Sequence, residues 1–360
     1  MIRKITIANT YHKYDGITKI SKFYQSALDS LGYDVNYVQF TYGDSDLEYS
    51  NPEIKGIKLP VRKLCKAVNI LFIFPRAFLK IDGDLFILSD PWLLKATKWR
   101  TNCILLFHDA RQLTKFREGY SASLLFRYLL KFVVNVKRVI AVSDTSKEAL
   151  LALSGLQSNK VSVLMNPLAK TASERTLIRK SFFEREDATL NVFYIAADQS
   201  HKNVIFFLNL AIAMLNEGSI KVKFNLVSEL SKRTKAHLGS EVPAGLKIMG
   251  KIEDMDGFYL GMDLLVFPSM YEGFGLPLSE AMSFGIPIIA KDIPSIREVL
   301  GDSGVLMPNY DLELWTSKIR AFADPSVYSK YSTLSKRRSE AFNFNSFKDS
   351  LKKIIEGIDL

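Results

Sequence analysis

Cysteine is scarce in this chain, which has only Cys65 and Cys103 among its 360 residues. The two lie far apart, in apolar or basic surroundings, and show no paired spacing. A disulfide framework or a cysteine-based zinc site is therefore not expected. Low cysteine content of this kind is typical of a protein in a reducing cytoplasm.

Long apolar runs are also lacking. The longest candidates, residues 67–74 and 124–136, are interrupted by Asn, Pro, Arg or Lys and do not reach the length needed to span a bilayer. The amino-terminal residues MIRKITIAN enter an alternating strand pattern and show no signal-peptide core or cleavage site. We expect a cytoplasmic protein that is soluble, or peripheral on the inner face of the membrane.

Acidic charge is sparse in the first half of the chain. Residues 1–170 hold 25 Lys and Arg against 14 Asp and Glu, whereas the remainder holds 23 against 24. A basic half favours an anionic partner. Nucleic acid is one candidate, but no recognised nucleic-acid motif accompanies the charge. An anionic membrane face or a phosphate-bearing acceptor explains it better, and we expect no nucleic-acid partner.

The basic half also contains two stretches that mix cations with aromatic residues. These are residues 62–80 and 115–139. Each is compatible with an ordinary helix that packs on the core and has a solvated basic side. Each is also compatible with an element that rests on an anionic membrane, where cations attract lipid headgroups while Phe and Leu enter the interface.

The order of apolar patterns predicts an α/β protein of two domains. An alternating strand at residues 3–9 is followed by an amphipathic helix, a stop at Gly32 and a second strand, which is a βαβ beginning. Continuous apolar runs, typical of buried parallel strands, follow at residues 84–89 and 103–108, and further strands are predicted at residues 138–143, 160–165, 190–195 and 223–228. In such folds ligands gather at the carboxyl ends of the strands.

Residues 264–304 carry the strongest local pattern. They predict a strand, a glycine-bearing turn, a helix opened by Pro277, a second strand and a helix from Pro294. The backbone amides of Gly273, Phe274, Gly275 and Leu276 would converge just before a helix amino terminus, which favours an anion.

Two carboxylates flank this turn, Glu272 before it and Glu280 inside the helix. Acceptors around an anion-binding turn suit a ligand that carries both phosphate and hydroxyl groups, such as a nucleotide sugar. Each feature alone has an ordinary explanation, because an early helical Glu favours the helix dipole and glycines often serve only the turn.

Three further residues are candidates because each follows a predicted strand. Lys202 stands at a helix entrance, where it could hold a phosphate, although an exposed lysine often has no such role. Gly16 lies in the loop after the first strand, where backbone could approach a diphosphate, but no GxGxxG dinucleotide fingerprint is present. His108 ends a strand and would face the crevice, although a lone His is more often structural.

One segment carries a family resemblance. The residues PS, EGFGLP, a Glu-containing helix ending in Gly285 and IPSIREV follow one another between about residues 250 and 308. In order and spacing they resemble glycosyltransferase family 4, also called glycosyl transferases group 1, whose retaining enzymes carry an E-x7-E motif in a GT-B fold. The resemblance implies two Rossmann-like domains, 1–167 and 168–341, with a terminal helix at 342–360 that packs back on the first.

The resemblance also implies a reaction and its residues. The reaction is transfer of a hexose, mannose or glucose, from a nucleotide-diphosphate sugar to a glycan, lipid-linked or other hydroxyl acceptor. Glu272 and His108 would contact the sugar, Glu280 the ribose, and Lys202 and the glycine turn the diphosphate. No metal or other cofactor is expected, because lysine and helix dipoles would carry the charge.

The chain departs from the family pattern before Lys202. Many members have a Gly-Arg pair there, and the Arg shares the diphosphate charge, whereas this chain has Ala196 and Ala197. A catalytically silent GT-B subunit, which binds a nucleotide sugar or acts as a scaffold, is therefore the alternative hypothesis.

Overall fold

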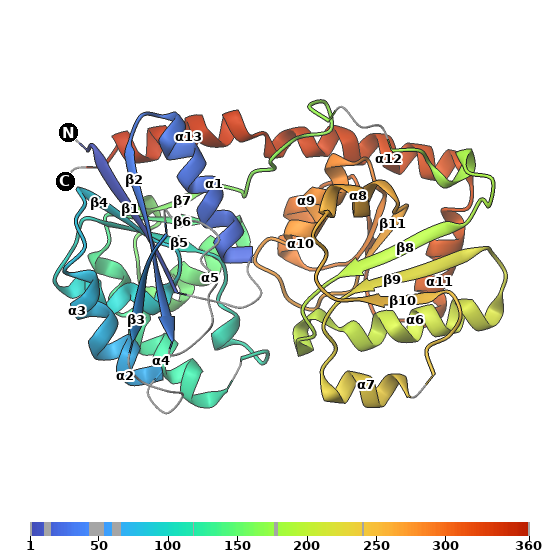
Figure 1. The fold of residues 1–360 in the computed structure, drawn as a ribbon, viewed down its shortest axis with the longest axis horizontal. Coiled ribbons are helices and arrows are strands. Elements are labelled where there is room, and N and C mark those ends of the chain that lie inside the picture. The colour runs from blue at the N-terminus through green and yellow to red at the C-terminus, as the bar shows by residue number, and fades with distance from the viewer. Residues whose placement is uncertain are drawn as a thin grey trace. The chain divides into compact units, whose positions relative to one another are not determined.

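The structure is a computed structural model that describes residues 2–10, 16–42, 54–59, 66–117, 119–175, 179–239 and 241–358. Cys65 and the beginning of the basic stretch at 62–80 lie outside the described residues. The chain divides into two compact units, one formed by Met1–Pro167 with Phe344–Leu360 and the other by Leu168–Asn343 (Figure 1). Each unit is a parallel sheet with helices against it.

The first unit contains a seven-stranded sheet in the order β3-β2-β1-β4-β5-β6-β7. All neighbouring strands are parallel. The sheet's order reverses between β1 and β4, which is the switch point where such sheets bind ligands. The strands are β1 (Lys4–Thr10), β2 (Asp34–Tyr42), β3 (Ile54–Leu59), β4 (Leu85–Leu88), β5 (Cys103–Phe107), β6 (Arg138–Ala141) and β7 (Val161–Val163).

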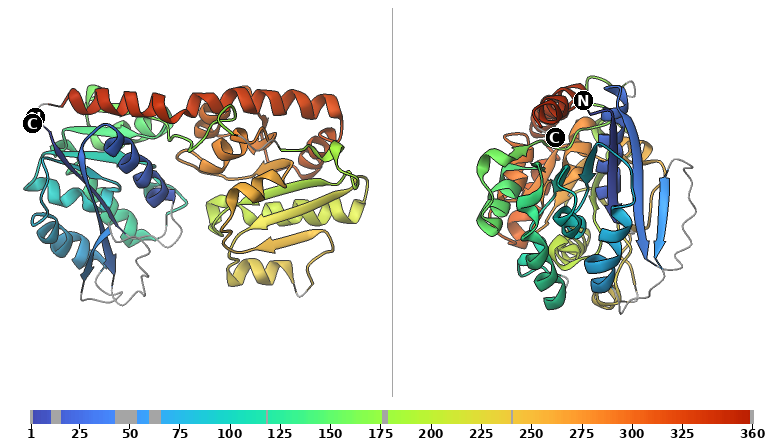
Figure 2. Two further views of the ribbon diagram at one scale, coloured as in Figure 1. Left: turned by 45° about the horizontal axis from the view of Figure 1, so that its top comes forward. Right: turned by 90° about the vertical axis from the view of Figure 1, so that its left-hand side faces the viewer.

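Helices cover both faces of this sheet. The carboxyl-terminal helix α13 (Phe344–Glu356) packs on α1 (Gly16–Ser30) (Figure 2). The Tyr24 and Phe347 rings meet there edge to face, at 5.0 Å between centroids. The other face carries an apolar core beneath the remaining helices. Those named below are α2 (Lys66–Val68), the π-helix η2 (Asn69–Ile73), α3 (Phe74–Phe78), the 3₁₀ helix η3 (Pro91–Lys98), α4 (Tyr120–Leu130) and α5 (Asp144–Ser154).

The second unit repeats the same topology with six strands, in the order β10-β9-β8-β11-β12-β13. All pairs are again parallel, and the order reverses between β8 and β11. The strands are β8 (Leu190–Ile195), β9 (Val222–Val227), β10 (Leu246–Met249), β11 (Leu264–Phe267), β12 (Ile288–Lys291) and β13 (Val305–Met307). The helices are η7 (Phe182–Glu184), η8 (Ser200–Lys202), α6 (Val204–Glu217), α7 (Lys232–Leu238), α8 (Met255–Leu260), α9 (Leu276–Ser283), α10 (Pro294–Leu300), α11 (Leu312–Ala321), α12 (Pro325–Ser339) and η9 (Glu340–Phe342).

A buried ionic network fixes the amino end of β11. Asp263 is fully buried and pairs with Arg179, 3.1 Å between Nη1 and Oδ1, and with Arg185. Burial raises the pKa of Asp263, against the lowering effect of the Asn191 N–H and the two guanidinium groups. Arg179 also donates to the Met262 carbonyl at 3.0 Å and to the Tyr328 hydroxyl on α12. The network therefore ties the sheet to the helix that covers it.

No helix among the described residues is both long and apolar enough to cross a membrane. The fold is the doubly wound α/β architecture that the sequence predicts, present twice.

Candidate functional site

Lys202 and Glu272 meet at the switch point of the second unit. Lys202 follows β8 and Glu272 follows β11, so both stand beyond the carboxyl ends of the two strands between which the order reverses. The Lys202 Nζ lies 2.7 Å from each carboxylate oxygen of Glu272. The Glu272 side chain is 7% exposed and the Lys202 side chain 23%, so solvent only partly screens this pair.

A buried tyrosine holds the two loops in register. The Tyr194 hydroxyl, on β8, donates to the Lys202 carbonyl at 2.7 Å and lies 2.8 Å from the Ser269 Oγ in the loop after β11. Burial, and secondarily the Glu272 charge, raises the pKa of Tyr194 well above its ordinary value. Tyr194 is therefore a neutral donor. Its only sign in the sequence is a tyrosine in an otherwise apolar strand.

Backbone contacts fix the loop of Glu272 further. The Glu272 carbonyl accepts from the Ser295 hydroxyl, at the start of α10, at 2.8 Å. The Met270 N–H donates to the His201 carbonyl at 2.7 Å, which joins this loop to η8. The charged pair is thus built on a rigid frame.

The glycine turn before α9 has the form that the sequence predicts. Gly275 caps the helix with φ of +88°, a left-handed conformation that favours glycine, and a Cβ there would meet the Leu278 Cδ1 at 3.0 Å. The N–H groups of Phe274, Gly275 and Leu276 donate to no backbone or side-chain acceptor within the described part of the chain. The Phe274 ring is buried and packs edge to face on Phe342, 5.7 Å between centroids. Only the backbone of Phe274 therefore remains for a ligand.

Glu280 lies inside α9, as the sequence predicts. The helix begins at Leu276, so Glu280 stands about one turn beyond its first residue. Its Oε2 accepts from the Tyr259 hydroxyl at 2.7 Å. Burial, followed by the Glu280 charge, raises the pKa of Tyr259 well above its ordinary value, so the tyrosine remains the donor.

His108 and Gly16 both belong to the first unit. His108 follows β5, and its Nε2 lies 2.9 Å from the Ser89 carbonyl. Because a carbonyl only accepts, this nitrogen carries the proton. Gly16 is the exposed first residue of α1, not a loop residue as predicted, because the helix begins one residue earlier than its sequence pattern.

Sequence reasoning missed a buried carboxylate at the switch point of the first unit. Asp90, just after β4, accepts from the hydroxyl of Thr10 at 2.6 Å and from its N–H at 3.1 Å. Asp90 also accepts from the Trp92 N–H at 2.9 Å, which caps η3. Its signal in the sequence was a single Asp after an apolar run, which is indistinguishable from an ordinary turn.

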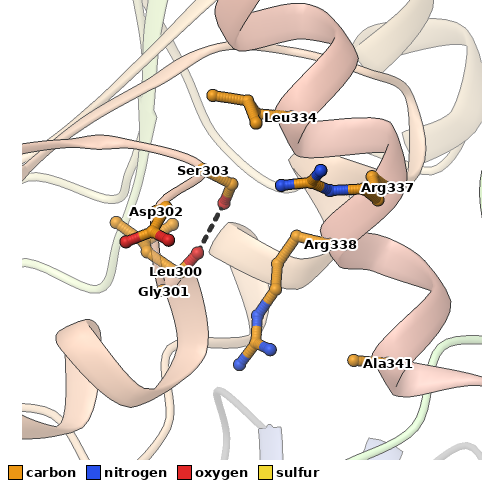
Figure 3. A pocket seen from close by; sticks show the side chains of 8 residues that line it. All are labelled: Leu300, Gly301, Asp302, Ser303, Leu334, Arg337, Arg338 and Ala341. Atoms are coloured by element: carbon orange, nitrogen blue, oxygen red, sulfur yellow. Dashed lines mark hydrogen bonds between the residues drawn. The ribbon is translucent and has the colours of Figure 1, made fainter.

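A cavity of about 290 Å³ lies elsewhere in the second unit, between the end of α10 and α12 (Figure 3). None of the predicted site residues lines it. Arg338 in its wall donates to the Val299 carbonyl at 2.9 Å and to the Glu298 carbonyl, so it caps α10. This cavity is therefore separate from the Lys202–Glu272 pair. No group of three or more His, Cys, Asp or Glu side chains in the described residues is placed to hold a metal ion.

Two family models match the chain. "Glycosyltransferase Family 4" matches residues 24–169, and "Glycosyl transferases group 1" matches residues 189–324. The chain belongs to glycosyltransferase family 4. Glu272 and Glu280 have the spacing of the E-x7-E motif named in the sequence resemblance.

Curated relatives of this family 4 chain include enzymes of O-antigen synthesis. The chain is 25% identical over 240 residues to the O-antigen chain mannosyltransferase RfbU of Salmonella typhimurium. This match covers 64% of each protein. It is 40% identical over 67 residues to the O-antigen chain mannosyltransferase B of Escherichia coli, 19% of this chain and 18% of that one. In both cases the match spans less than two thirds of the relative's own length.

Solved structures show the fold of this family 4 chain. Anabaena Alr3699/HepE, in complex with UDP and glucose, aligns with a TM-score of 0.75 at 15% identity and covers 99% of this chain and 100% of its own. WaaG, a glycosyltransferase involved in lipopolysaccharide biosynthesis, aligns with a TM-score of 0.75 at 14% identity, covering 98% and 100%. The fold is GT-B, as the sequence resemblance implied.

Proposed function

We propose that this glycosyltransferase transfers a hexose, mannose or glucose, from a nucleotide-diphosphate sugar to a hydroxyl of a glycan or lipid-linked acceptor, with retention of configuration, in polysaccharide or glycoconjugate biosynthesis. The observation that carries the proposal is the Lys202–Glu272 pair beside the glycine turn at the β8/β11 switch point. The O-antigen mannosyltransferases among the relatives favour mannose.

In this proposal the donor diphosphate replaces the Glu272 carboxylate on Lys202. A diphosphate carries more negative charge than a carboxylate and can also accept from the N–H groups of residues 273–276. Glu272 is then released to accept from sugar hydroxyls. These preorganised donors would stabilise the diphosphate as it leaves, without a metal ion.

Glu280 binds the ribose hydroxyls in the same scheme. The Tyr259 hydroxyl, 2.7 Å from one carboxylate oxygen, would orient the Glu280 carboxylate for the nucleoside. The two glutamates do not act as a glycosidase pair, because Lys202 and the glycine turn address a phosphate that simple glycosides lack.

The first unit supplies the acceptor side. His108 would position the sugar, with its ring orientation set by the Ser89 carbonyl, and Gly16 would let backbone approach the donor diphosphate. The basic charge of residues 1–170, 25 Lys and Arg against 14 Asp and Glu, favours an acceptor held at an anionic surface. We place the enzyme in the cytoplasm, at the inner face of the membrane.

The alternative proposal is a catalytically silent nucleotide-sugar-binding or scaffold subunit. It is supported by Ala196 and Ala197, which stand where many family members have Gly-Arg, so that the Arg expected to share the diphosphate charge is missing from that place in the sequence. Donor binding without turnover across a panel of acceptors would favour this alternative.

The test is sugar transfer by two single variants, each with a matched control. Lys202→Ala and Glu272→Ala should abolish transfer from a labelled GDP- or UDP-sugar. Lys318→Ala and Glu313→Ala, which remove the same charges from exposed positions on α11, should retain it. Thermal unfolding of all four shows whether the fold is intact. Turnover at the wild-type rate in either site variant would contradict the proposal.

A further inference from the structure

We infer that the first unit carries a lipid-docking surface that binds anionic bilayers. It is built from short helical elements that lie far apart in the sequence and together present exposed aromatic rings among cations. This aromatic–cationic surface is defined by Phe72, Arg76, Lys95, Lys98, Trp99 and Tyr128. The inference builds on the proposed function, because the surface would bring the enzyme to an acceptor at a membrane. Its test uses no sugar donor, so a failure of the membrane test can be told apart from a failure of the proposed reaction.

The helix η3 joins the two basic stretches that the sequence singled out. The Lys95 Nζ lies 4.4 Å from the centroid of the Phe72 ring on η2. On the other side, the Thr97 hydroxyl of η3 donates to the Phe132 carbonyl just after α4, at 3.0 Å. The Phe132 ring in turn meets the Tyr128 ring edge to face, at 5.4 Å between centroids. Three segments that are separate in the sequence are therefore in contact with one another in the fold, and the middle one was not predicted.

The surface is unusually rich in exposed apolar groups. Phe72 is 50% exposed, Trp99 54% and Tyr128 40%. Of the eleven large hydrophobic side chains exposed among the described residues, eight lie between residues 68 and 134 and only two lie in the second unit. A concentration of this kind indicates an interaction site, because single exposed hydrophobic residues are otherwise scattered.

Among the residues that the structure describes, the cations of this surface have no acidic partner in an ion pair. None of the ion pairs in the described part of the chain involves Arg76, Lys95 or Lys98. Residues 66–80, 91–102 and 119–143 contain no Asp or Glu. Burial lowers the pKa of Lys95, and the charges of Lys98 and Arg76 lower it further, so the three cations repel one another. An external anionic surface would relieve this repulsion.

An anionic bilayer fits this chemistry better than a nucleic acid or an acidic protein. Trp and Tyr favour the headgroup level of a membrane, and Lys and Arg extend their charged ends toward lipid phosphates while their stems cover apolar surface. Leu79, Leu124 and Val134 are also exposed in the same segments. Burial of these side chains at the boundary of the acyl chains would stabilise membrane binding, whereas they have no favourable contact to make with a sugar-phosphate backbone. The occupant is therefore an anionic lipid surface, bound without a spanning helix.

The first test is co-sedimentation of the full chain with vesicles. We expect binding to phosphatidylcholine vesicles that contain phosphatidylglycerol, and little binding to phosphatidylcholine alone. The double variant Lys95→Glu and Lys98→Glu should weaken binding by about thirtyfold or more. The matched double variant Lys232→Glu and Lys235→Glu, at exposed positions on α7 of the second unit, should bind as the wild type does.

The second test locates the contact. Trp99 is the one largely exposed tryptophan, because Trp92 and Trp315 are buried. Brominated anionic lipids should quench the fluorescence of the wild type, and Trp99→Phe should lose most of that quenching while it still binds. Equal binding to both vesicle types, equal weakening by the two double variants, or unchanged quenching in Trp99→Phe would overturn the inference. So would binding to RNA or to an acidic protein without binding to vesicles.

Discussion

The two units share one topology but differ in what stands at the switch point. Between β8 and β11 the second unit holds a lysine and a glutamate 2.7 Å apart beside a glycine turn. Between β1 and β4 the first unit holds Asp90, satisfied by Thr10 and Trp92. The comparison shows that the sheet order supplies an edge for ligands, while the side chains decide what each edge can bind.

The surfaces of the units differ as well. Among the described residues, nine of the eleven exposed large hydrophobic side chains lie in the first unit, which also carries the excess of cations. In the second unit, charged side chains form internal networks, such as the one in which Arg179 pairs with Asp263. We therefore expect the second unit to bind the donor and the first to face the acceptor and its surroundings.

The largest expected effect is on the stability of the second unit. Arg179→Ala should destabilise it by about 3–5 kcal/mol, because the buried Asp263 loses one of its two cationic partners. Arg100→Ala in the first unit removes hydrogen bonds to the Ile81 and Leu79 carbonyls and should cost about 1–2 kcal/mol. Denaturant unfolding of both variants measures the difference. Equal losses would remove the contrast between the internal networks.

The next effect sharpens the roles of the two glutamates. Glu272→Gln should bind a nucleoside diphosphate more tightly than the wild type, by about tenfold, because a neutral amide competes less for Lys202. Glu280→Gln should bind it more weakly, because a neutral amide oxygen replaces the charged acceptor of the ribose hydroxyls. Isothermal titration calorimetry measures both. A decrease in Glu272→Gln would show that the ion pair does not compete with the donor.

A smaller effect comes from the turn before α9. Gly275→Ala should cost about 1–2 kcal/mol of stability, because an L-residue at φ of +88° is strained and its Cβ would press on Leu278. Gly155→Ala in the first unit is the matched control, with positive φ but open space around it. It should cost less, and thermal unfolding compares the two. The reverse order would show that the Leu278 contact does not matter.

The smallest expected effect is that of metal removal, which should not change the rate of transfer. If Lys202 and the turn amides neutralise the leaving diphosphate, EDTA should leave the rate of transfer unchanged. Rates with EDTA, and with Mg²⁺ or Mn²⁺ restored, give the measurement. A metal-dependent rate would require cation ligands that the present scheme does not include.

The sequence predicts the sheet framework well because the signals are local. Buried parallel strands such as β4 and β5 read as unbroken apolar runs, and Pro277 with Gly275 marks the start of α9 within a residue. The 3₁₀ helix η3 was not predicted, because its eight residues are too few for a helical period to be recognised.

The site was predicted as separate residues but not as an arrangement. Lys202 and Glu272 are 70 residues apart, and nothing in either segment indicates that they touch. Tyr194 and Tyr259 could not be predicted as hydrogen-bond donors, because a buried tyrosine in an apolar segment looks like any core aromatic. These contacts depend on tertiary packing, which brings distant segments together.

The most direct test of the central claim is calorimetric titration of a nucleoside diphosphate into wild type, Lys202→Ala and the control Lys318→Ala. The wild type and the control should bind GDP or UDP with the same affinity. The affinity of Lys202→Ala for the nucleoside diphosphate should be about a hundredfold lower, because the diphosphate loses its charge-assisted partner at the β8/β11 switch point. Equal affinity in Lys202→Ala and the wild type would contradict the account.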